Sequence, residues 1–108
     1  MAKLEKTLTG SFDAILSKIE DGILSGSVSA TLEDSSDFRL DGVRCSVRVF
    51  ERFSYIGGNR VSMNVTLLGN GDTVKISAIT SGGSQAMFIK FNTFGEEAFL
   101  KKLREILE

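Results

Sequence analysis

The chain of 108 residues contains no histidine, no proline, no tryptophan and a single cysteine. Without histidine it lacks the commonest general base and metal ligand at neutral pH. One cysteine excludes an internal disulfide and makes a zinc site implausible. There is no apolar run of about 20 residues that could span a membrane, and residues 1–10 lack the apolar region of a secretory signal. These absences favour a cytoplasmic protein without a catalytic site, metal or cofactor.

Charge is balanced over the whole chain but segregated along it. The formal net charge is −1, and 42% of residues are hydrophobic and 25% charged, which is typical of one soluble globular domain over residues 1–108. Residues 1–38 carry three lysines and seven acids, whereas residues 39–60 carry five arginines and two acids. The arginines are therefore expected either to pair with the acidic first third across strands or to form a surface for an anionic partner.

Three stretches, 43–55, 61–68 and 73–80, alternate apolar and polar residues and predict long strands joined by glycine-containing turns. The apolar positions are Val43, Cys45, Val47, Val49, Val61, Met63, Val65, Leu67, Val74, Ile76 and Ala78. This period of two predicts an antiparallel sheet covered on one face, with all of these side chains on the covered face. Glu51 would then lie on the apolar face, so a bulge is expected near residues 50–52. Shorter strands are predicted at 3–9, 27–33 and 85–91.

Two amphipathic helices complete the pattern. Ser11 is a predicted N-cap for a helix that Gly26 ends. Thr93 and Glu96 have the spacing of a capping box, which predicts the start of a second helix. In that helix Leu103 lies at the centre of the apolar stripe and Lys102 is expected to face solvent. The stripes are Phe12, Ile15, Leu16, Ile19 and Ile23 in the first helix, and Phe99, Leu100, Leu103, Ile106 and Leu107 in the second.

The predicted order is strand, helix, five strands, helix. Short turns make the sheet antiparallel, and both helices must cover its apolar face. The fold class is therefore α+β, with a single curved antiparallel sheet and two helices packed on one face.

No constellation of residues predicts catalysis. Cys45 falls on the apolar face and is expected to be a small buried hydrophobic residue rather than a nucleophile. The serines have no evident base, and the carboxylates are scattered or lie near helix ends. The glycine pairs at 57–58 and 82–83 match neither GxGxxG nor a Walker loop, so they are interpreted as hairpin turns.

A candidate binding surface follows the arginine-rich strand. Arg44, Arg48 and Arg52 are predicted to project from the uncovered face with Phe50 among them, an arrangement that resembles single-strand nucleic-acid binders. The sequence pI of about 5.5 argues against nucleic acid as the main partner. The complete candidate surface is Arg44, Arg48, Phe50, Arg52, Tyr55 and Arg60.

The element order resembles two groups of curved-sheet folds, the TATA-binding-protein-like architecture and the helix-grip proteins of the Bet v 1 and START kind. The helix-grip resemblance implies an apolar ligand between the sheet and the C-terminal helix, lined here by Val47, Val49, Val65, Ile76, Leu100 and Leu103. The residues around 51–55, 57–60 and 77–85 also resemble a small bacterial family of unknown function. That family resemblance implies no catalytic or binding residue.

Three functions remain open from the sequence. The first is a non-enzymatic binding or protein-interaction domain, with self-association through an exposed sheet face or edge, because Phe50, Leu68 and Ile79 interrupt the polar face. The second is a carrier of a small apolar ligand. The third is anion or nucleic-acid binding along the arginines.

Overall fold

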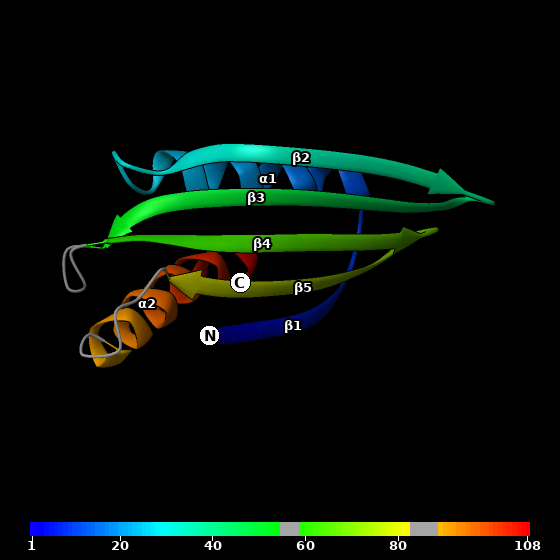
Figure 1. Ribbon diagram of the computed structural model, residues 1–108. Helices are drawn as coiled ribbons and strands as arrows, with labels where there is room; N and C mark the ends of the chain where they lie inside the picture. Colours follow the sequence, from blue (N-terminus) through cyan, green and yellow to red (C-terminus); the bar gives the residue numbers. More distant parts are fainter. Residues whose placement is uncertain (55–58, 83–88) are drawn as a thin grey trace.

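In a computed structural model that describes residues 1–54, 59–82 and 89–108, five strands form one antiparallel sheet. The chain runs β1 (Ala2–Thr9), α1 (Phe12–Ser25), β2 (Thr31–Leu40), β3 (Val43–Ser54), β4 (Asn59–Asn70), β5 (Thr73–Gly82) and α2 (Ile89–Leu107). The order across the sheet is β1-β5-β4-β3-β2, so β1 and β2 are the edges (Figure 1). The predicted α+β class with helices on an antiparallel sheet is confirmed.

Both helices pack on the same face of the sheet, and Figure 1 views the opposite face, with α1 passing behind β2 and β3. Their buried side chains join the apolar residues of β4 and β5 in one core. Gly69 of β4 leaves room for the Phe12 ring, since a Cβ added there would lie 2.4 Å from Phe12 Cδ2. Gly22 likewise lets Ile106 of α2 approach α1 closely.

The ends of α1 follow the sequence prediction. Ser11 caps the helix, and its Oγ accepts a hydrogen bond from the amide of Ala14 at 3.2 Å. Gly26 ends it, with its N–H donating to the Gly22 carbonyl.

Two element boundaries differ from the prediction. The expected strand at 27–33 is displaced, because β2 begins at Thr31 and continues to Leu40, while Val28 is fully exposed. The missed signal was Asp41-Gly42, a two-residue hairpin turn in which both residues have positive φ, 48° and 80°. The expected strand at 85–91 lies partly outside the described residues, and Ile89 already belongs to α2. A run this short does not distinguish strand from helix by its alternation.

The predicted capping box is also wrong, because α2 begins four residues before Thr93. Glu96 is buried, and its carboxylate accepts a hydrogen bond from the amide of Gly82 at 3.0 Å and lies 3.1 Å from the Met1 ammonium group. Glu96 therefore ties α2 to the ends of β5 and β1.

The most consequential correction concerns the orientation of β3. The face predicted to be covered by the helices is the uncovered one, and the face predicted to be uncovered lies under the helices. The register of β3 with β4 pairs Arg48 with Val65 and Phe50 with Met63, so these β3 residues face the helices. Val47 and Val49 lie on the uncovered face. Glu51 lies there too and pairs with Arg60 at 2.9 Å, so β3 needs no bulge. The irregularity in this part of the sheet is in β2, between Leu32 and Asp34.

Docking of α2 provides a test of this core. Leu103 is fully buried, so Leu103→Ala should lower the free energy of unfolding by about 2–5 kcal/mol through lost burial and a cavity. The matched control is Lys101→Ala on the exposed face of α2, expected to change stability by no more than about 0.5 kcal/mol. The prediction that Lys102 faces solvent is wrong, because this residue is half-buried and its side chain packs against Gly26. Equal urea midpoints for the two variants would contradict this docking.

Candidate functional site

The predicted arginine surface lies largely inside the protein. Phe50 is fully buried in the core and Arg48 is 7% exposed, while Arg44 and Arg52 are half-buried beneath the helices. Arg60 is exposed on the other face of the sheet, and Tyr55 lies outside the described residues. The five described residues of this set therefore do not form one surface, because the β3 register turns four of them toward α1 and α2.

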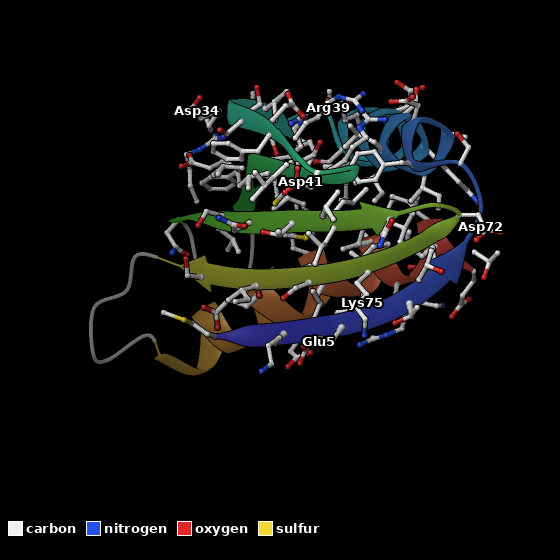
Figure 2. All side chains as sticks on the ribbon, turned by 90° about the vertical axis from the view of Figure 1, so that its right-hand side faces the viewer. Glu5, Asp34, Arg39, Asp41, Asp72 and Lys75 are labelled. Carbon is white, nitrogen blue, oxygen red and sulfur yellow. The ribbon has the colours of Figure 1, made fainter. Side chains whose placement is uncertain are left out.

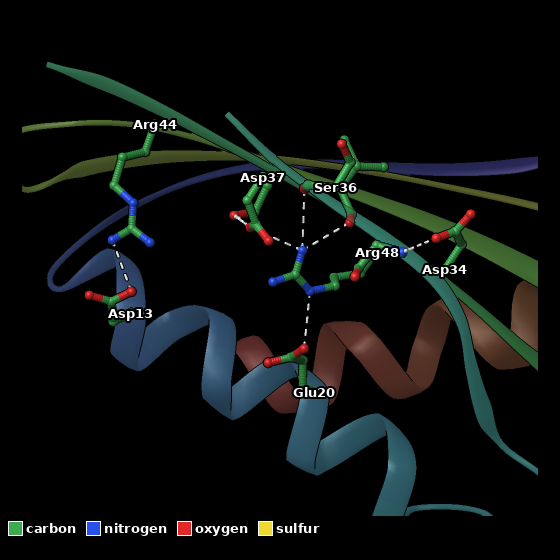
Figure 3. Close-up of polar contacts among 10 residues, drawn as sticks. Asp13, Glu20, Asp34, Ser36, Asp37, Arg44 and Arg48 are labelled. Atoms are coloured by element: carbon green, nitrogen blue, oxygen red, sulfur yellow. Dashed lines mark hydrogen bonds and ion pairs between the residues drawn. The ribbon is translucent and has the colours of Figure 1, made fainter. Parts of the chain in front are cut away.

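Arg48 is held by two carboxylates from different elements (Figure 3). Its Nε donates to Glu20 Oε2 of α1 at 3.0 Å, and its Nη1 lies 3.1 Å from Asp37 Oδ1 of β2. Nη1 also donates to the carbonyls of Ser36 and Val47. Burial disfavours the charged guanidinium, but the hydrogen bonds to Glu20 and Asp37 outweigh this and raise the pKa of Arg48. These contacts fasten α1 to the β2–β3 half of the sheet.

The carboxylate of Asp37 has two partners on β3, Ser46 and Arg48. Ser46 Oγ donates to its Oδ1 at 2.5 Å, and Arg48 approaches the same oxygen. The Ser46 hydrogen bond, followed by that of Arg48, lowers the pKa of Asp37. The carboxylate therefore stays charged to a lower pH than an isolated aspartate would.

The two flanking arginines stack on aromatic rings of the helices. Arg44 lies 4.2 Å from the Phe12 ring centroid and pairs with Asp13 at 2.9 Å. Arg52 lies 4.7 Å from the Phe99 ring centroid, and burial lowers its pKa. Carboxylates and aromatic rings of the two helices thus contact Arg44, Arg48 and Arg52. These contacts explain why the arginines lie on the helix side of the sheet.

The uncovered face of the sheet, called the open face below, carries the apolar residues that β3 does not bury. Phe38, Cys45 and Leu68 form one row across β2, β3 and β4, and Leu40 lies opposite Val43 beside them. Phe38 is 61% exposed, Leu40 75% and Leu68 46%. We call these residues, with Val47 and Val49, the apolar stripe: Phe38, Leu40, Val43, Cys45, Val47, Val49 and Leu68.

A hollow of about 710 Å³ opens to solvent at the end of the stripe nearest the β2–β3 turn. Apolar groups of Phe38, Leu40, Val43, Cys45 and Leu68 line it, and Arg39 and Asp41 flank it. Figure 2 shows Arg39 and Asp41 near this turn, with Glu5 and Lys75 on β1 and β5. Isolated apolar residues on a surface are ordinary, but a contiguous set around a hollow marks a contact site.

The sequence reading located this site only in part. Leu68 was recognised as an apolar residue on the uncovered face, as was Ile79, which is 42% exposed there. The predicted face of the valines and Cys45 is wrong, and the strand predicted at 27–33 ends before Phe38 and Leu40.

Family comparison agrees with part of the resemblance drawn from the sequence. A model described as a family of unknown function, DUF6054, matches residues 1–108. The chain belongs to this family. No curated protein and no solved structure matches the chain significantly. The likeness to TATA-binding-protein-like and helix-grip folds thus has no structural neighbour to support it.

The part of the chain that the structure describes contains neither a metal-binding cluster nor a membrane-spanning helix. Within residues 1–54, 59–82 and 89–108, no three metal-binding side chains lie together. None of the helices in these ranges is long and apolar enough to span a membrane.

The buried guanidinium makes a prediction about stability. Arg48→Met removes the hydrogen bonds to Glu20 and Asp37 and should lower the free energy of unfolding by about 1–3 kcal/mol. Arg44→Met should cost no more than about 1 kcal/mol, because its partner Asp13 is mostly exposed to solvent. Urea denaturation of both variants measures the difference. A cost for Arg44→Met as large as that for Arg48→Met would contradict the assigned role of Arg48.

Asp37 predicts a specific acid dependence. Because its pKa is lower in the folded than in the unfolded state, its contribution to stability is complete above pH ~4 and is lost as pH falls through the folded pKa. Asp37→Asn removes this titration, so the unfolding free energy of the variant should fall less between pH ~4 and pH ~2 than that of the unsubstituted chain. Parallel acid limbs in the two stability curves would show that Asp37 is not held as described.

Proposed function

We propose that this chain is a non-enzymatic interaction domain that binds another protein through the open face. The observation that carries the proposal is the apolar stripe, which lies on the side of the sheet that neither helix covers. Phe38, Leu40 and Leu68 are exposed in the midst of half-buried valines. Contact with a partner would remove these side chains from water, and each large apolar group fully buried contributes about 1.5–3 kcal/mol before the costs of association.

The cytoplasm fits this function as the proposed location. Cys45 is unpaired and half-buried on the open face, and a free thiol there is compatible with a reducing compartment.

The two alternative functions lose the surfaces on which they depended. Of the residues expected to line a ligand cavity under α2, Val47 and Val49 lie on the open face instead. Val65, Ile76, Leu100 and Leu103 are buried in the core. Arg44 and Arg48, expected to hold an anion, are engaged by Asp13, Glu20 and Asp37. A small apolar molecule would have to occupy the hollow on the open face, which makes it a competitor for the same surface.

Site-specific photo-crosslinking in the native host tests the proposal. A diazirine-bearing amino acid at Leu68 should give covalent protein adducts on irradiation, because this side chain lies within the proposed interface. The same amino acid at Lys101, exposed on α2, should give few or none. Absence of protein adducts from position 68, in a variant with unchanged circular dichroism, would contradict an interaction through the open face.

A further inference from the structure

We infer that the protein bound by the open face is a second copy of this chain, related to the first by a twofold axis in the plane between the two sheets. This inference rests on the proposed function and adds the identity of the partner. Three properties of the open face support it: its size, its shape and the arrangement of its charges.

The size of the open face matches a protein interface. Five strands about 4.8 Å apart and about 10 residues long, at roughly 3.3 Å per residue, present about 800 Å². A stable complex buries about 800 Å² on each partner. The two short dimensions of the molecule, 24 Å and 22 Å, agree with one sheet and one helical layer. A second sheet could therefore stack on the open face about 10 Å away. A small molecule in the hollow would cover one end of the stripe but would leave Val47, Val49 and the rest of the open face in water.

The shape of the stripe is suited to contact with an identical surface. Phe38 and Leu40 are exposed on β2 and form one side of the hollow, whose lining also includes Val43, Cys45 and Leu68. In a twofold interface the same patch serves both partners, so each copy must supply both protruding groups and the space to receive them. The open face has both within one patch.

The open face carries charges of both signs in nearly equal number. Its strand positions carry Lys3, Glu5, Asp34, Glu51, Arg60 and Lys75, three of each sign. The carboxylate of Glu33, at the irregularity in β2, also reaches this face, where it accepts a hydrogen bond from Thr31. Lys3 pairs with Glu5 at 3.5 Å, and Arg60 with Glu51 at 2.9 Å. Asp34 and Lys75 make no ion pair with any described residue. A surface with a large net charge would repel its own copy, whereas the open face has nearly equal numbers of positive and negative groups.

The unpaired charges also indicate how the copies are oriented. Asp34 of β2 pairs with Val49 of β3, and Lys75 of β5 pairs with Leu68 of β4. Because Leu68 in turn pairs with Cys45, the two charges lie diagonally opposite each other across β3 and β4. A twofold axis midway between these two charges passes near Val47 and places each Asp34 over Lys75 of the other copy. The stripe then lies at the centre of the interface, and charges lie at its rim.

Pairing through the free edge of β2 is the less favourable way to form a dimer. The strand carries Glu33, Asp34 and Asp37, and a register irregularity interrupts it between Leu32 and Asp34. Acidic side chains and bulges are the features that protect sheet edges from pairing with each other. Face-to-face packing avoids bringing these carboxylates together along the edge.

Sedimentation of the purified full chain over a range of concentrations tests the inference. We expect a dimer whose Kd rises at least about tenfold in Leu68→Glu, because the interface would bury an uncompensated charge. Lys101→Glu, on the exposed side of α2, should leave the Kd unchanged. A chain that stays monomeric at about 1 mM, or a dimer indifferent to Leu68→Glu, would overturn the inference.

A charge exchange tests the orientation of the two copies. Lys75→Glu and Asp34→Lys should each weaken the homodimer, since like charges would then face each other. An equimolar mixture of the two variants should restore the dimer, because both contacts in the mixed pair join opposite charges. Failure of the mixture to dimerise, with both variants folded by circular dichroism, would overturn the orientation.

The crosslinking outcome separates this inference from the proposed function. An adduct from position 68 with twice the mass of the chain supports the second copy as occupant. An adduct with a different protein overturns the second copy but agrees with an interaction through the open face. A native mass spectrum that shows only a monomer with a retained small molecule would contradict the second copy directly.

Discussion

The pairing register between β3 and β4 is the constraint on which the rest of this structure depends. Side chains alternate strictly along a strand, so a shift of one residue exchanges its two faces. Ser54 pairs with Asn59, which leaves four residues between the strands, and with this even number Arg48 is opposite Val65. An odd number would have placed Val47 there and made both strands apolar on the helix side. The parity of one loop therefore decides which side chains of β3 are covered.

The position of Arg48 follows from that register, and so do its partners. A guanidinium beneath a helix is tolerated only with hydrogen-bond acceptors around it, and here Glu20 of α1 and Asp37 of β2 supply them. The same register leaves the valines of β3 on the open face. The polar contacts inside and the apolar stripe outside are two results of one choice of register.

Much of the fold could be predicted from the sequence because it is specified locally. Ser11 and Gly26 mark the ends of α1, and the alternation in β4 and β5 identifies their buried faces correctly. The buried face of β3 could not be predicted in the same way, since both of its faces contain apolar residues and a loop of uncertain length precedes β4. Glu51 was the one local warning, because the assumed orientation placed a carboxylate in the core. Asp41-Gly42 was a second available signal, and with it the strand that carries Phe38 and Leu40 would have been recognised.

The place of β1 at the edge beside β5 has a consequence for how the chain folds as it is made. The four strands from β2 to β5 are each adjacent in sequence to their neighbours, so they can assemble progressively as they leave the ribosome. β1 precedes all of them, yet Ala2 pairs with Thr80 and Thr9 with Thr73. β1 is translated before the other strands, so it must remain unpaired until nearly the whole sheet exists. Lys3, Glu5 and Lys6 interrupt the apolar residues of β1, so the unpaired segment stays solvated and is less prone to pair with another nascent chain.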